Sequence, residues 1–103
     1  MAEVLTIEEL RSRIDVIDDQ LVKLLNVRVA CAVEVGRLKH EAGLPIYQPD
    51  RESQVLTRVK QSASNLSGPL TADAVVRIFE RVIDEARRAE RSASERRDGS
   101  PLA

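Results

Sequence analysis

The fold is decided by one long stretch without proline, residues 6–43, which reads TIEELRSRIDVIDDQLVKLLNVRVACAVEVGRLKHEAG. At its start Thr6 is followed three residues later by Glu9, the pattern of a capping box, in which each side chain accepts a hydrogen bond from the other residue's backbone N–H. Gly36 is the one weak helix former inside it, a tolerated cost of about 1 kcal/mol. We therefore predict a single helix of about 35 residues, roughly 50 Å long.

A proline-containing connector and a second helix follow. The two prolines of residues 45–49 favour an extended chain, because each proline disfavours helix in the residue before it. A second helix can begin at Pro49 or Asp50 and run to about residue 63. Residues 62–69 are rich in Ser, Asn, Gly and Pro, which indicates a loop.

A third helix completes the predicted fold. Thr71 is a good N-cap for a helix over residues 72–90. From Arg91 onward the composition changes to Ser, Arg, Glu, Gly and Pro, and we expect about the last ten residues to be disordered. The sequence therefore predicts an all-α chain of three helices, with one domain over residues 1–90 and a disordered tail over residues 91–103.

The charge balance argues against a nucleic-acid partner. The chain has 16 Lys and Arg against 17 Asp and Glu, so no strong positive patch is expected. One run of arginines is interleaved with acids and is best interpreted as a solvated helix end; it comprises Arg87, Arg88, Arg91, Arg96 and Arg97. Tyr47 and Phe79 are the only aromatic residues, which argues against base stacking.

Cysteine usage and hydropathy narrow the class further. Cys31 is the only cysteine, so an intramolecular disulfide is excluded, and no Cys/His spacing indicates a zinc site. The N-terminus carries acids where a signal peptide needs positive charge, and no segment approaches the ~18 apolar residues of a membrane span. We expect a cytoplasmic protein with no metal, cofactor or membrane partner.

The first helix carries an apolar seam that one chain cannot cover. Apolar residues recur at spacings of three and four, and they are Leu10, Ile14, Ile17, Leu21, Leu24, Cys31, Val35 and Leu38. The two shorter helices reach only part of this length, and exposed apolar surface costs about 25 cal/mol per Å². The seam therefore predicts a homodimer, although a plain coiled coil would show the same pattern.

Arg28 interrupts this seam at a position due for an apolar residue. No acid lies three or four residues from it, so its guanidinium needs an anion from another helix or from a ligand. Lys39, at the edge of the same stripe, has a similar requirement. Arg11 is less informative, because Glu8 and Asp15 lie within reach and favour a surface ion pair.

Two acids could form ion pairs with these cations. Glu52 lies in the first turn of the second helix, where the helix dipole alone favours a carboxylate. Glu90 follows Phe79, Ile83 and Ala86 on an apolar stripe, which is equally consistent with a helix end that reaches water. The chain has no Ser/His/Asp set and no phosphate loop, so an enzyme of this kind would act by positioning and electrostatics on a small multi-anionic substrate.

Four motifs in order resemble the AroQ-type, all-helical chorismate mutases: LRSRIDVID at residues 10–18, LLNVR at 24–28, VGRLK at 35–39 and PDRE at 49–52. The resemblance extends from about Leu5 to Glu90. It implies an intertwined homodimer of three-helix chains and an isomerase that rearranges chorismate to prephenate in the shikimate pathway of aromatic amino acid biosynthesis. That reaction needs neither a nucleophile nor a cofactor.

The resemblance also implies a role for each matching residue. Arg28 and the partner's Arg11 would hold the two substrate carboxylates. Lys39 would donate to a carboxylate and to the ether oxygen. Arg51 would help to order the site, and Glu52 would accept a hydrogen bond from the ring hydroxyl.

Three positions depart from the bacterial pattern of this family. Gln48 stands where an aspartate is common, and Ala86 replaces a small hydroxyl residue that would touch a carboxylate. Glu90 replaces a glutamine that would donate to the ether oxygen. Only a protonated Glu90 could donate there, so we hypothesise that activity is higher at mildly acidic pH.

Other functions remain open at this point. A related enzyme on the same scaffold would act on 4-amino-4-deoxychorismate or would be an isochorismate pyruvate lyase. A helical dimerisation module without catalysis would need acids from neighbouring helices to satisfy Arg28 and Lys39. A mutase regulated or activated by a partner enzyme is a further alternative.

Overall fold

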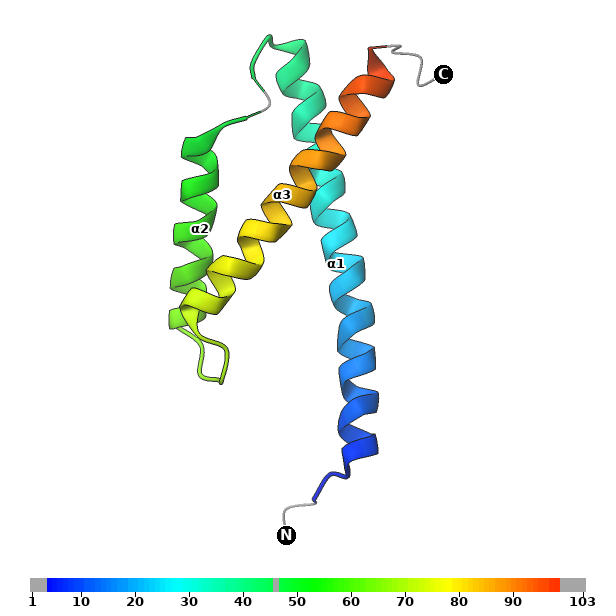
Figure 1. Cartoon of the computed structure of the whole chain (residues 1–103), viewed down its shortest axis with the longest axis vertical. Coiled ribbons are helices and arrows are strands. Elements are labelled where there is room, and N and C mark those ends of the chain that lie inside the picture. The colour runs from blue at the N-terminus through cyan, green and yellow to red at the C-terminus, as the bar shows by residue number, and fades with distance from the viewer. Residues whose placement is uncertain (1–3, 46, 99–103) are drawn as a thin grey trace.

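The computed structural model describes residues 4–45 and 47–98, and these form three helices without a strand. The helices are α1 (Ile7–Glu41), α2 (Pro49–Ser64) and α3 (Ala72–Arg97). Helix α3 crosses the molecule diagonally and packs against both other helices, whereas α1 and α2 do not pack directly on each other (Figure 1). The predicted all-α, three-helix chain is confirmed.

Local sequence signals set both ends of α1. The capping box forms as predicted: Thr6 N donates to Glu9 Oε2 at 2.9 Å, and Glu9 N donates to Thr6 Oγ1 at 3.1 Å. The helix ends before Gly43, whose φ of 71° lies in the left-handed region that a side chain disfavours. This turn reverses the chain, so that the connector leads back to the start of α2 (Figure 1).

Helix α3 is longer than the sequence predicts. Thr71 caps it by accepting a hydrogen bond from Ala74 N at 3.1 Å, as expected. It then continues to Arg97, so the expectation of disorder is wrong for residues 91–98, and residues 99–103 lie outside the described residues. The extension is held by tertiary contact: Ala93 is buried, and Asp98 lies 3.5 Å from His40 Nε2 of α1.

The core of a single chain is small. Its buried apolar residues within the described ranges are Val55, Val59, Ala86 and Ala93. The chain exposes 8292 Å², whereas a compact monomer of its mass would expose about 5,800 Å². One chain therefore lacks the burial that a compact domain of this length achieves.

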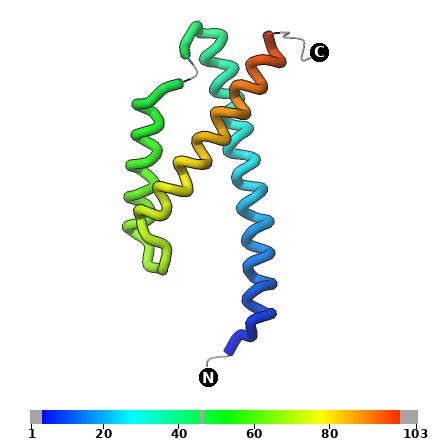
Figure 2. Tube along the Cα trace, viewed as in Figure 1, coloured from blue at the N-terminus to red at the C-terminus, as the bar shows by residue number. Residues whose placement is uncertain are grey.

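The apolar seam of α1 accounts for much of this exposed surface. Leu10, Ile14, Ile17, Leu21 and Leu24 are each between 44% and 66% exposed. Figure 2 shows that this half of α1 projects alone, away from α2 and α3. The expectation that one chain leaves its seam uncovered is confirmed, while the dimer remains a prediction. Among residues 4–45 and 47–98, no helix is long and apolar enough to cross a membrane.

Candidate active site

The three helices enclose an open cavity of about 290 Å³. Its apolar wall comes mainly from Ala32, Val35, Val55 and Ile83. Seven residues that the sequence singled out also line it, and they are Arg28, Lys39, Gln48, Arg51, Glu52, Ala86 and Glu90. Segments far apart in the chain thus bring every predicted site residue except Arg11 to one place. Cys31, a residue of the apolar seam, is exposed in the single chain and lines the cavity as well.

Four cations and two carboxyl groups face this cavity. The cations are Arg28 and Lys39 from α1 and Arg51 and Arg58 from α2. Arg58 was not anticipated, although its spacing of seven from Arg51 places both on the same face of a helix. An excess of positive charge in a partly apolar cavity suits a small ligand with more than one negative charge.

Arg28 is half-buried and forms no ion pair with any residue of 4–45 or 47–98. Its guanidinium lies over the Phe79 ring of α3, 5.9 Å from the centroid. A salt bridge to another helix would explain this arginine structurally, but the described residues do not form one. The cation remains available to an anion that enters the cavity.

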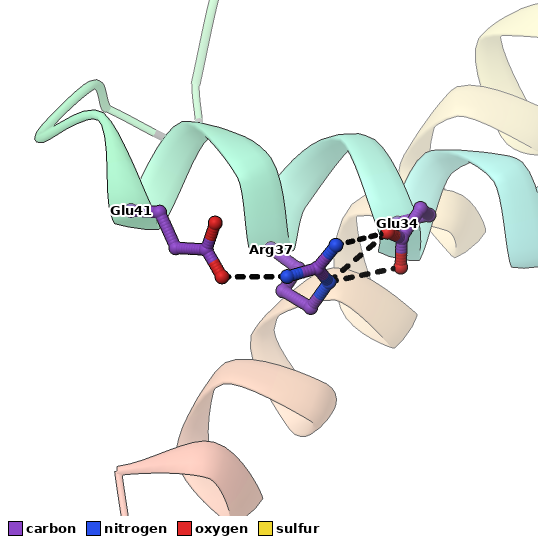
Figure 3. A network of polar contacts seen from close by, with 3 residues as sticks. All are labelled: Glu34, Arg37 and Glu41. Carbon is purple, nitrogen blue, oxygen red and sulfur yellow. Dashed lines mark hydrogen bonds and ion pairs between the residues drawn. The ribbon is translucent and has the colours of Figure 1, made fainter.

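Arg37, further along the same helix, shows the contrasting case. Its guanidinium is held by two acids of its own helix: Nε donates to Glu34 Oε1 at 3.0 Å, and Nη1 donates to Glu41 Oε1 at 2.5 Å (Figure 3). These contacts lie on the surface and stabilise the end of α1. Arg37 needs no ligand, whereas Arg28 has no comparable partner in the described chain.

Glu90 is largely shielded from solvent beside Lys39, at the crossing of α3 and α1. Glu90 Oε2 lies 3.8 Å from Lys39 Nζ, and the two side chains are only 13% and 12% exposed. Gly36 makes this approach possible, because a Cβ there would lie 3.3 Å from the same oxygen. The alternative that Glu90 marks a helix end reaching water is therefore wrong.

The environment of Glu90 favours its protonated form. Burial raises the pKa of the Glu90 carboxyl above its usual value, while the positive charges of Lys39 and Arg87 oppose that rise. Its Oε2 atom is buried without a hydrogen-bond partner in the described protein. A protonated carboxyl group here could donate a hydrogen bond to a ligand atom in the cavity.

Glu52 is held by an arginine that the sequence did not single out as a site residue. Arg87 Nη2 donates to Glu52 Oε1 at 2.6 Å and to Oε2 at 2.5 Å. The Arg87 side chain is 24% exposed, so its interpretation as part of a solvated basic run is wrong. Arg87 directly follows Ala86 and lies one helical turn before Glu90, and this position in the sequence could have indicated that it lies near the site.

Arg11 lies outside the cavity, in the half of α1 that no other helix of the chain covers. The expected surface ion pair with Glu8 or Asp15 is not formed within the described residues. Such exposed ion pairs stabilise a protein by only a few tenths of a kcal/mol, which is too little to hold the two side chains together. The suggested role of Arg11 in a partner's site stays a prediction.

The comparisons with known proteins agree with this geometry. The model of the family "Chorismate mutase type II" matches residues 10–91. The chain belongs to this family. The matched range contains every predicted site residue, from Arg11 to Glu90.

Several chorismate mutase relatives are similar over most of this chain. It is 38% identical over 90 residues to the bifunctional chorismate mutase/prephenate dehydratase of Neisseria gonorrhoeae, covering 84% of this chain and 24% of that protein. It is 33% identical to the protein of the same name from Aquifex aeolicus, covering 75% of this chain and 22% of that protein. The chain thus spans about a quarter or less of these bifunctional relatives.

Solved chorismate mutases share the three-helix fold. The Form II structure of the enzyme from Thermus thermophilus superposes with a TM-score of 0.75 at 28% identity, covering 82% of this chain and 93% of that one. The chorismate mutase of Helicobacter pylori, solved in complex with prephenate, also gives a TM-score of 0.75 at 28% identity, covering 86% and 93%. The three-helix fold of the single chain, expected from the resemblance, is confirmed.

Proposed function

We propose that this chain is a chorismate mutase that rearranges chorismate to prephenate, acting in aromatic amino acid biosynthesis in the cytoplasm. The observation that carries the proposal is the cavity, in which a half-buried Arg28 lacks an anion among the described residues and lies with three further cations. Chorismate carries two carboxylates, so its charge complements this lining. Membership of the chorismate mutase type II family supports the same conclusion.

The proposed mechanism requires binding and electrostatics only. Arg28 holds one carboxylate, and the partner's Arg11 holds the other. Lys39 donates to a carboxylate and to the ether oxygen, on which negative charge grows as the C–O bond breaks and the new C–C bond forms. Arg51 helps to order the site, while Glu52 accepts from the ring hydroxyl. No proton is transferred and no covalent intermediate forms, so donors already in place lower the barrier.

The proposal includes a homodimer. Exposed leucines and isoleucines follow one face of α1 for most of its length, and a second copy of α1 offers the same face. Arg11 lies on this uncovered half of α1. A partner chain packed there would bring its own Arg11 toward the cavity of the first chain, so that each site uses residues of both chains.

The direct test is to mix purified protein with chorismate and follow the loss of its ultraviolet absorbance. We expect rapid loss with prephenate as the product. No loss at any pH from about 5 to 8 would overturn the proposal. Isochorismate and 4-amino-4-deoxychorismate would then be tried, and inactivity with all three would favour a dimerisation module without catalysis.

The raised pKa of Glu90 predicts a pH profile. At mildly acidic pH the neutral carboxyl can donate to the ether oxygen, whereas the ionised form repels the growing negative charge. The folded-state pKa lies above the usual value, so kcat/KM should fall as the pH rises through that folded-state pKa. Glu90→Gln keeps a donor that does not ionise and should flatten this fall.

Glu85→Gln is the matched control for this prediction. Glu85 lies on the same helix but is 48% exposed and pairs with Arg81 rather than facing the cavity. The control should keep the wild-type profile. A Glu90→Gln enzyme whose activity still falls over the same pH range would show that another group titrates.

A further inference from the structure

Arg87 links the wall of the cavity to the rest of the chain without lining the cavity itself. One of its guanidinium nitrogens, Nη2, donates to both carboxylate oxygens of Glu52, which joins α3 to α2. Its other terminal nitrogen, Nη1, lies 3.7 Å from Asp84 Oδ1 on its own helix. The guanidinium also lies over the Tyr47 ring, 5.1 Å from the centroid. Three separate segments therefore hold this one cation in place.

This arrangement fixes the Glu52 carboxylate. Charge-assisted hydrogen bonds are shorter and roughly twice as strong as neutral ones. The Arg87 and Glu52 side chains are only 24% and 27% exposed, so solvent screens their attraction less than that of a surface pair. Tyr47 adds a cation–π contact from the connector that precedes α2. The Glu52 carboxylate is consequently held in one orientation at the cavity wall.

The pairing also limits what Glu52 can bind. Each carboxylate oxygen keeps a lone pair after it accepts from Arg87, so it can still accept from a neutral O–H group. Its negative charge is already offset by Arg87. An ammonium group at the same point would gain little attraction from Glu52 and would meet the cations Arg28, Arg51 and Arg58 that line the same cavity.

We propose that Arg87 is a positioning and specificity residue, which holds Glu52 as an acceptor for a neutral ring hydroxyl and disfavours a substrate with an ammonium group there. The inference rests on the proposed function, since it takes the ring hydroxyl of chorismate as the group that Glu52 contacts. Arg87 acts through Glu52 and does not itself touch the substrate.

Arg87 has a second, measurable influence, on Glu90. The charged groups that face Glu90 are Lys39 of α1, Glu52 of α2 and Arg87 of α3 itself; the two cations lower the pKa of Glu90, and Glu52 raises it. Removing the Arg87 charge leaves Glu52 uncompensated beside Glu90. The fall of activity with pH should therefore move to higher pH, a change that a purely structural defect would not produce.

The experiment compares Arg87→Met, Arg87→Lys and a control, Arg88→Met, with the wild type. Arg88 is the next residue on α3, but its side chain is 68% exposed and pairs only with Glu85 among the described residues. For each protein, kcat and KM are measured with chorismate and with 4-amino-4-deoxychorismate across the pH range. The ratio of the two kcat/KM values reports specificity.

We expect Arg87→Met to lower kcat/KM for chorismate about tenfold, mainly through KM, as typical for loss of one charged hydrogen bond. The specificity ratio should move about tenfold toward the amino substrate, because the negative charge of Glu52 is then no longer offset by Arg87 and attracts an ammonium group. Arg87→Lys keeps the cation and should hold the ratio near the wild-type value. Arg88→Met should change neither quantity.

Equal losses for both substrates with an unmoved pH profile would overturn the proposal, because Arg87 would then serve the fold alone. A wild type inactive on both substrates would defeat the proposed function instead. The Arg87–Glu52 contact is then still testable by nitrogen NMR of the free protein. Glu52→Gln should speed rotation of the Arg87 guanidinium group, and unchanged rotation would contradict the contact on which the inference rests.

Discussion

Replacing Arg28 with alanine is expected to lower kcat/KM for chorismate by about a thousandfold, because an alanine leaves one substrate carboxylate without its charged partner. Arg28 is half-buried, lines the cavity and has no ion pair within residues 4–45 and 47–98. Its removal therefore breaks no salt bridge of the described fold. The loss should appear in the steady-state kinetics of chorismate consumption, with thermal unfolding little changed.

Arg37→Ala provides the control for Arg28→Ala. Arg37 is an arginine of the same helix whose charge is balanced by Glu34 and Glu41 (Figure 3). Its removal costs surface ion pairs that are worth little, so activity should change less than about threefold. If Arg28→Ala kept most of its activity, or if both variants lost activity equally, Arg28 would not be a substrate-binding residue.

Leu21→Glu is expected to dissociate the proposed dimer and to abolish its activity. Leu21 lies in the middle of the α1 seam and is 50% exposed in the single chain. An unpaired carboxylate buried between two helices costs several kcal/mol, which corresponds to a rise of at least about a hundredfold in the dimer dissociation constant. Sedimentation at several concentrations, together with the chorismate assay, measures both effects.

Lys23→Glu is the matched control for Leu21→Glu. Lys23 lies on the same turn of α1 but points away from the seam, since two residues on a helix differ by about 200° in direction. This variant should remain dimeric and active. A Leu21→Glu protein that kept its mass and activity would show that the exposed seam is not the dimer interface.

The first helix could be predicted closely because its signals are local. The pair Thr6 and Glu9 caps its start, the absence of proline sustains it, and Gly43 ends it, and each acts over a few residues. Arg28 could also be singled out, because a cation inside an apolar seam without an acid one turn away is visible in the sequence. The structure then placed it in the cavity.

The rest of the site depends on how α3 packs, which the sequence pattern does not specify. Glu90 proved to be only 13% exposed because Gly36 allows α3 to approach α1 closely, and this contact joins distant parts of the chain. Arg87 was assigned to a solvated helix end because its run of arginines is interleaved with acids, yet its guanidinium donates to Glu52 of α2. The extension of α3 to Arg97 has the same origin, because tertiary contact overrode a composition typical of a tail.

The central claim is that each active site combines Arg28 of one chain with the partner's Arg11, and mixing two inactive variants tests it most directly. Arg11→Ala and Arg28→Ala are unfolded together in equal amounts, refolded and assayed with chorismate. About half of the dimers should then be mixed, and each mixed dimer regains one of its two sites, so about a quarter of wild-type activity should return. If Arg11 served the site of its own chain, every site would keep one defect, and a mixture as inactive as its components would contradict the account.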